Sequence, residues 1–191
     1  MAVIFCLTLT PASLLAAPAF AQTQGAQPAL SDADREVASA FEKRVKEYAD
    51  LRERLEEKLP KLPKDATPEQ IATHKKSFQE MVRAARSGAK HGDVFTPEAA
   101  ALIRSLIRRT FQGKDRAELR ETVFEAETKG VPVRVNYTYP ETKELVEMPP
   151  TLLLNLPQLP KQVRYRFVGR NLLLVDRENG LIVDYMTNAL P

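Results

Sequence analysis

Histidine and aspartate occur together in one short loop of the chain. His91 and Asp93 are separated by one residue, and imidazole and carboxylate groups are ligands that transition metals accept. A metal site needs three or more ligands in suitable geometry, and the only other histidine, His74, falls on the apolar stripe of an expected helix. We expect His74 to be a partly buried, hydrogen-bonded residue. His91 and Asp93 are therefore a candidate metal site, with a plain polar turn as the simpler interpretation, and no cofactor is expected.

A second pair that could do chemistry is Asp176 and Asp184, on the two arms of a C-terminal hairpin. Carboxylate pairs serve as general acid and base, or bind a hard cation. A two-residue turn ending at Gly180 would place them on opposite faces, whereas a three-residue loop with a glycine bulge would pair Val175 with Val183. We favour the second register because it gives a clean apolar face. It places both aspartates together on the polar side, where a solvated surface is the simpler interpretation.

Basic side chains repeat on two of the expected helices. They could bind anionic glycans, lipids or an acidic partner, although an ordinary solvated helix face is the simpler interpretation. No aromatic residues are interleaved with them and the net charge is only +3, so nucleic acid is not an expected partner. The members are Arg83, Arg86 and Lys90 in one group and Arg104, Arg108 and Arg109 in the other.

Local catalytic motifs are missing from the sequence. It contains no G-x-S-x-G elbow, P-loop, dinucleotide fingerprint or H-E-x-x-H motif. The single cysteine, Cys6, lies in the apolar N-terminal segment, so a chain without that segment would have neither a disulfide nor a thiol nucleophile. Enzymes whose catalytic residues are dispersed along the chain stay compatible with this pattern.

The N-terminal segment 1–21 predicts export. It is uncharged and apolar and ends in Ala19-Phe20-Ala21, the small-x-small pattern of a cleavage site. It lacks the usual early Lys or Arg, which a start codon placed too far downstream would explain. An uncleaved membrane anchor is disfavoured because Pro11 and Pro18 interrupt the run. We expect a signal peptide over 1–21, a flexible leader over 22–30, no membrane span after cleavage, and a periplasmic or secreted protein.

The region 31–127 has helical periodicity. Apolar residues recur at spacings of three and four from Val37 to Leu59 and again from Ile71 to Ala85. Ser31 can cap the first helix, and Thr67-Pro68-Glu69-Gln70 is a capping box with proline at the first helical position. The short proline-containing linker predicts an antiparallel helical hairpin. A third helix is expected after Thr96, with Leu102, Ile103, Leu106, Ile107 and Phe111 inward, and a shorter fourth after Asp115.

From Gly130 onward the hydrophobic period changes from about 3.6 to about 2 residues. Alternation over 131–139 predicts a half-buried strand, and a weaker strand is expected over 144–148. The prolines of 149–160 predict one helical turn and an extended crossing, followed by a three-stranded meander over 161–185. The fold class is therefore α+β, with the helical region 31–127 packed on an antiparallel region, 128–191, as one composite domain. The expected helix-facing side of the meander comprises Tyr165, Phe167, Leu173, Val175, Val183 and Tyr185.

The C-terminal run also follows a recognisable order of residues. Leu159-Pro160 precedes a strand with Tyr165, Gly169 turns the chain, a strand ends at Leu174-Val175, and Gly180-Leu181-Ile182 begins the return. This order resembles the C-terminal pattern of small periplasmic proteins of the nickel/cobalt-homeostasis type. The likeness covers 159–183 and implies an antiparallel sheet and, as an expectation, an accessory role in metal homeostasis.

No set of nucleophile, base or metal ligands converges in the sequence, whereas the structural signals are strong. We therefore expect a non-catalytic envelope or secreted protein that binds another envelope protein or an anionic envelope component through its helical hairpin or a sheet edge. One alternative is a hydrolase of envelope glycans or peptides that uses dispersed carboxylates. The other is the periplasmic metal-homeostasis accessory protein that the resemblance implies.

Overall fold

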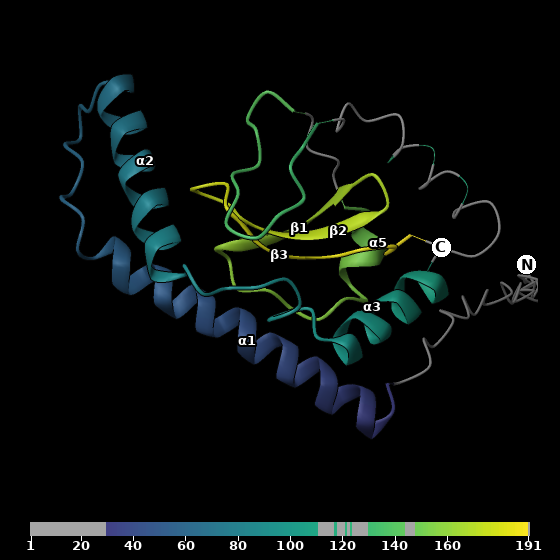
Figure 1. Ribbon diagram of the computed structural model, residues 1–191. Coiled ribbons are helices and arrows are strands. Elements are labelled where there is room, and N and C mark those ends of the chain that lie inside the picture. The colour runs from purple at the N-terminus through teal and green to yellow at the C-terminus, as the bar shows by residue number, and fades with distance from the viewer. Residues whose placement is uncertain are drawn as a thin grey trace, which may run out of the picture.

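The computed structural model describes residues 30–110, 117, 121, 123, 130–143 and 148–190. Helices precede a single antiparallel sheet, so the fold is α+β as predicted (Figure 1). The elements are α1 (Asp32–Glu56), α2 (Pro68–Ala85), α3 (Pro97–Thr110), α5 (Pro150–Leu153), β1 (Val163–Val168), β2 (Asn171–Asp176) and β3 (Ile182–Met186). Figure 1 shows α1 and α3 on one side of the sheet and the segment 130–143 on the other.

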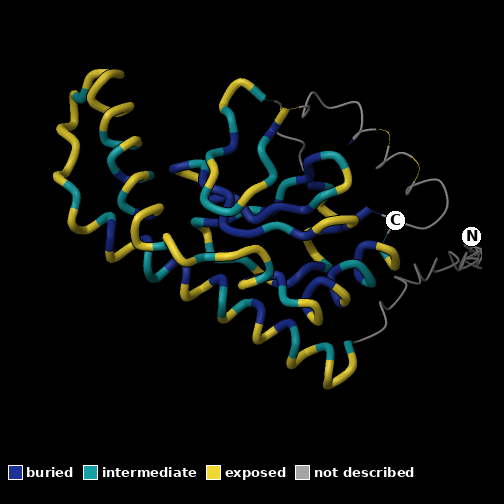
Figure 2. Tube along the Cα trace, in the orientation of Figure 1, coloured by how far each residue is buried: buried dark blue, intermediate teal, exposed yellow. Residues whose placement is uncertain are grey.

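The helical hairpin forms where its local signals predict it. The Ser31 side chain accepts a hydrogen bond from the Asp34 amide and begins α1, while Thr67 and Gln70 form the expected capping box of α2. Only Phe78 and Val82 of α2 are fully buried. Ile71, expected on the inner face, is 49% exposed because the first turns of α2 stand at the free end of the hairpin (Figure 2).

The sheet has the order β1-β2-β3, and its second hairpin contains a bulge. Leu173 pairs with Tyr185, as the favoured register requires. Val175 pairs with Ile182 rather than with Val183, so that predicted pair was wrong. The shift between Leu174 and Val175 leaves Val183 as the extra residue, which places the irregularity inside β3 instead of at the glycine.

Both faces of the sheet are covered, which the expectation of one apolar face did not include. The helix side carries Tyr165, Phe167, Leu172, Leu174, Val183 and Met186. Leu173, Val175 and Tyr185, expected there, lie on the opposite face with Val131 and Tyr139. The cause is the tight turn at Gly169-Arg170, which pairs Phe167 with Leu172 and so gives the helix side to the even-numbered leucines of β2.

The predicted strand over 131–139 is wrong. This segment makes one isolated bridge, between Thr138 and Leu181, although its backbone also exchanges hydrogen bonds with Ile182. Asn136 has a φ of +62°, which interrupts the extended conformation. The Arg86 guanidinium donates to the Asn136 side chain at 2.8 Å, and the Asn136 amide donates back to the Arg86 carbonyl at 2.6 Å. This reciprocal contact replaces regular pairing with a turn.

Some predictions fall outside the described residues. The signal peptide and nearly all of the leader lie there, as do most of the fourth helix after Asp115 and the strand over 144–148 apart from Met148. The helical turn expected after the paired prolines is confirmed as α5. Within the ranges given above, no helix is both long enough and apolar enough to cross a membrane.

Candidate functional site

Asp184 is fully buried on the helix side of β3, so its predicted place on a solvated surface was wrong. Its Oδ2 accepts hydrogen bonds from the Val94 and Phe95 amides at 2.9 and 2.8 Å. Its Oδ1 accepts from the Gly92 amide at 3.1 Å and from the Tyr185 amide at 2.8 Å. The loop before α3 thus turns its backbone amides, which lack helical partners, onto one carboxylate.

Asp176, at the end of β2, is also fully buried rather than solvated. Its Oδ2 accepts from the Tyr48 hydroxyl at 2.7 Å and lies 3.0 Å from the Arg52 Nε, while Oδ1 accepts from the Glu178 and Asn179 amides. Burial, and then the charge of Asp176, raises the pKa of Tyr48 well above its usual value. The two aspartates therefore do not form a carboxylate pair, because each is bound by a separate set of donors.

Arg52 links the buried part of the molecule to its surface. Its guanidinium also pairs with Glu178 and Glu56 and lies 4.9 Å from the centre of the Phe78 ring. Burial lowers the pKa of Arg52, but Asp176 and Glu178 outweigh that effect, so the pKa is raised overall. A buried carboxylate is tolerated here because a cation and several donors surround it.

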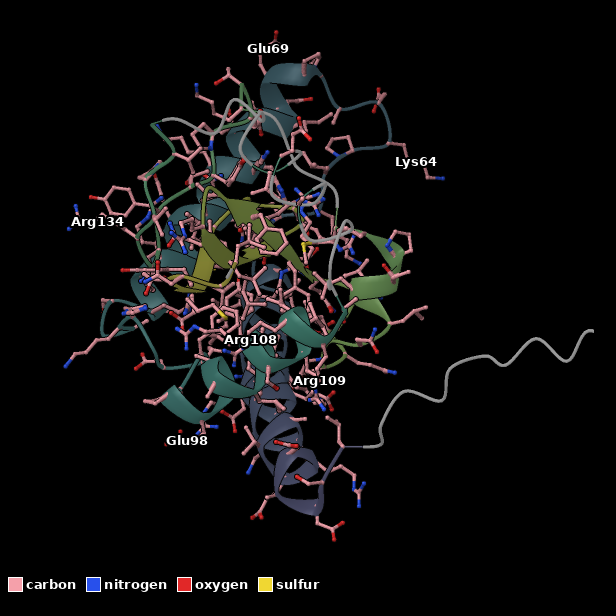
Figure 3. All side chains as sticks on the ribbon, turned by 90° about the vertical axis from the view of Figure 1, so that its right-hand side faces the viewer. Lys64, Glu69, Glu98, Arg108, Arg109 and Arg134 are labelled. Atoms are coloured by element: carbon pink, nitrogen blue, oxygen red, sulfur yellow. The ribbon has the colours of Figure 1, made fainter. Side chains whose placement is uncertain are left out.

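The basic helical residues mostly connect α2 and α3 to the rest of the fold. Arg83 donates to the Asn136 carbonyl, Arg86 to the Val183 carbonyl, and Arg104 to the carbonyls of Thr187 and Asn188. Arg86 also lies over the Tyr48 ring, and burial lowers the pKa of Arg86. Arg108 is exposed on α3, beside Arg109 (Figure 3). Three of the five predicted anion-binding arginines, Arg83, Arg86 and Arg104, thus donate to backbone carbonyls and connect their helices to the rest of the fold.

His91 and Asp93 have separate contacts. The His91 ring stacks on Tyr185 with centroids 4.1 Å apart, and the Asp93 carboxylate accepts from the Lys90 amide at 2.7 Å. His74 is half-buried and lines a hollow at the free end of the hairpin. The part of the chain that the structure describes holds no group of three or more His, Cys, Asp or Glu side chains placed to bind a metal ion.

A hollow of about 460 Å³ lies at the edge of β1, against the crossing segment 157–161. We call it the basic hollow because its charged lining residues are Lys161, Arg164, Arg166 and Arg177. No Asp or Glu occurs among the described residues that line it. Its apolar wall comprises Met148, Leu153, Pro157, Leu159, Pro160 and Val163. The arrangement combines a concentration of positive charge with an apolar wall, as small-molecule sites do.

Strand alternation and register build the basic hollow. Alternation in β1 directs Arg164 and Arg166 away from the side of Tyr165, and the hydroxyl of Tyr165 donates to the Pro157 carbonyl at 3.0 Å. Burial raises the pKa of Tyr165 well above its usual value, with a further contribution from Glu42. The register Val163–Asp176 then brings Arg177 beside β1, where its Nε lies 3.4 Å from the Val163 carbonyl.

Like charges crowd in the basic hollow. Burial lowers the pKa of Arg164, and the charge of Arg177 lowers it further, while Asp176 acts in the opposite direction. Sequence reasoning missed this cluster because Arg177 is distant from Arg164 along the chain. A two-residue turn at Gly169-Arg170 pairs Val168 with Asn171. Counting along both strands from this pair reaches Val163 opposite Asp176, which brings Arg177 close to Arg164.

No protein-family model matches the chain, and no curated protein or solved structure matches it either. The resemblance of the C-terminal segment to nickel/cobalt-homeostasis proteins therefore stays a prediction.

Proposed function

We propose that the protein is an exported, non-catalytic binding protein that holds an anionic component of the envelope in the basic hollow. One observation carries this proposal: four cationic side chains line a single hollow, and no described lining residue is a carboxylate. A bound anion would relieve the repulsion between Arg164 and Arg177 and gain charge-assisted hydrogen bonds from the cationic lining.

The types of the lining side chains favour an anion with several oxygens. Arg164, Arg166 and Arg177 each carry a planar guanidinium, which can donate two parallel hydrogen bonds to a phosphate or carboxylate. Lys161 and Arg177 are exposed, so their long side chains can adjust to the ligand. The apolar wall beside them lowers the local dielectric and strengthens these contacts.

The non-catalytic part of the proposal rests on the two aspartates of the hydrolase alternative. A general acid or base must come within hydrogen-bond reach of its substrate. Asp176 and Asp184 are both 0% exposed, and both oxygens of each accept from protein donors.

The metal-homeostasis alternative would need ligands beyond His91 and Asp93. Export rests on the segment 1–21, and intact Met1 in cytoplasmic protein from the native host would contradict it.

Isothermal titration calorimetry with inorganic pyrophosphate at low ionic strength tests the proposal. We expect binding that weakens with added salt. The double variant Arg164→Gln/Arg177→Gln should bind at least about tenfold more weakly, a loss of about 1.4 kcal/mol. The matched control Arg108→Gln/Arg109→Gln removes the same charge from the outer face of α3 (Figure 3) and should bind normally. Equal weakening in both variants, or no binding by the unaltered protein, would contradict the proposal.

A further inference from the structure

Leucine side chains are held in solvent beside the basic hollow. Leu154 is 85% exposed, the highest value among the large apolar residues recorded as exposed in the described part of the chain, and Leu153 is 48% exposed. Leu153 also lines the basic hollow. Isolated exposed leucines are ordinary, but these two are adjacent in sequence and Leu153 borders a cluster of cations, which is the composition of an interaction surface.

The fold fixes these leucines in an outward position. Three leucines in succession cannot all point inward from one helical turn, and in α5 it is Leu152 that is fully buried. Pro150 begins the turn, and the Asn155 side chain donates to the Thr151 carbonyl at 2.8 Å. Leu153 and Leu154 are therefore presented by a short, anchored element. A surface that can receive them gains the free energy of removing apolar area from water.

We propose that the basic hollow, together with α5 and its C-cap residue Leu154, forms a docking surface for an anionic phospholipid membrane. A lipid phosphate binds between Arg164 and Arg177, while Leu153 and Leu154 enter the interfacial layer beside that headgroup. This inference rests on the proposed function and specifies its anionic component as a phospholipid. Cations next to a membrane attract anionic headgroups, and apolar side chains beside them bury area at the boundary with the acyl chains.

The dimensions of the surface favour reversible attachment. α5 is four residues long, far short of the roughly 20 residues that a membrane-spanning helix needs. The hollow of about 460 Å³ lies within the size range of small-molecule sites and suits one headgroup. Charge complementarity and a small apolar contact together give an attachment that depends on lipid composition and on salt.

Vesicle flotation tests the inference, with pyrophosphate calorimetry run in parallel on the same proteins. The protein should bind vesicles of equal parts phosphatidylglycerol and phosphatidylcholine, and not vesicles of phosphatidylcholine alone. Leu154→Ser should weaken vesicle binding at least about tenfold, which is about 1.4 kcal/mol, and leave pyrophosphate binding unchanged. The control Ile71→Ser changes a 49% exposed side chain on α2 and should alter neither reading. The double variant Arg164→Gln/Arg177→Gln should lose both vesicle binding and pyrophosphate binding.

Each other outcome has a distinct meaning. If the unaltered protein bound pyrophosphate but not the anionic vesicles, the lipid inference would be overturned and the proposed function would stand. If the unaltered protein bound neither, both would be overturned. Equal binding to the two kinds of vesicle would overturn the headgroup assignment. Vesicle binding unaffected by Leu154→Ser, or weakened equally by Ile71→Ser, would overturn the role of α5. Because the Leu154 side chain is almost fully exposed, a urea melt of that variant should match the unaltered protein.

Discussion

The sheet carries charge in two regions that use it differently. On the helix side, Asp176 and Asp184 are fully buried, and donors from α1, from the loop before α3 and from neighbouring backbone amides occupy their oxygens. In the basic hollow at the edge of β1, Arg164 and Arg177 crowd each other instead. Residue type therefore does not separate structural from binding charges. What separates them is whether the fold buries the charge within a full set of donors, because Arg166 and Arg177 contact backbone carbonyls yet stay partly or fully exposed.

Solvation explains this division. An uncompensated buried charge costs several kcal/mol, so a fully buried aspartate persists only where the fold surrounds it with donors. A half-exposed arginine stays hydrated and tolerates an incomplete set of partners. The first region should therefore respond to substitution through stability, and the second through ligand binding.

The largest expected loss of stability follows substitution of Asp184, whose carboxylate accepts hydrogen bonds from four backbone amides. Asp184→Asn replaces one acceptor oxygen with a donor facing backbone amides, which should lower the free energy of unfolding by about 3–5 kcal/mol in urea melts. Asp93→Asn is the control: Asp93 is exposed and accepts from one amide, so its loss should cost about 1 kcal/mol or less. If Asp184→Asn left the free energy of unfolding unchanged, Asp184 would not be a structural charge, and the contrast with the arginines of the basic hollow would fail.

A smaller loss is expected at the other buried carboxylate. Arg52→Gln removes the cation beside Asp176 but leaves the Tyr48 hydroxyl and two amides, so we expect a loss of about 2–4 kcal/mol by urea denaturation. Arg54→Gln removes the same charge from an exposed position two residues along α1 and should cost under about 0.5 kcal/mol. Similar losses in the two variants would show that burial of the Arg52–Asp176 pair is not what matters.

Alkaline pH should weaken the buried side through its tyrosines. The pKa of Tyr48 and that of Tyr165 are raised above the usual value near 10 in the folded protein. Stability is therefore unaffected by these groups below about pH 10 and falls as the pH rises above it, by about 1.4 kcal/mol per unit for each group. Urea melts between about pH 9 and pH 11 should give a shallower decline for Tyr48→Phe and for Tyr165→Phe. If stability fell with pH as steeply in these variants as in the unaltered protein, the raised pKa values of Tyr48 and Tyr165 would not be the cause of the decline.

The smallest effect on intrinsic stability is expected in the basic hollow. Arg164→Gln/Arg177→Gln should change the free energy of unfolding by about 1 kcal/mol or less, because relief of repulsion offsets lost contacts. Pyrophosphate should stabilise the unaltered protein, by about 2.7 kcal/mol at a hundredfold excess over its Kd, and should leave this variant unchanged at the same concentration. A large intrinsic loss without any ligand effect would assign these arginines a structural role.

The parts of the fold that depend on local signals could be predicted from the sequence. The Ser31 cap, the capping box at Thr67 and the proline-started turn at Pro150 each act within a few residues, and all three are present. The strand expected over 131–139 failed because its backbone conformation depends on Arg86, 50 residues away from Asn136. The continuous apolar run of β2 did indicate burial on both faces, a signal that the favoured register overlooked.

The site was less predictable because its partners are distant in sequence. Tyr48 lies 128 residues from Asp176, and the Phe95 amide lies 89 residues from Asp184. No pattern of spacing reports such contacts, so the sequence alone predicts a solvated face for two aspartates that are in fact buried. The basic hollow depends on a register that joins Arg177 to β1, and the residues there carry no motif.

The most direct test measures pyrophosphate binding and the free energy of unfolding on the same two variants, Asp184→Asn and Arg164→Gln/Arg177→Gln. The account predicts that Asp184→Asn loses stability while its folded fraction binds pyrophosphate with the affinity of the unaltered protein. The arginine variant should keep its stability and bind at least about tenfold more weakly. Pyrophosphate binding lost in the folded fraction of Asp184→Asn and retained in the arginine variant would contradict the division between buried structural charge and open binding charge.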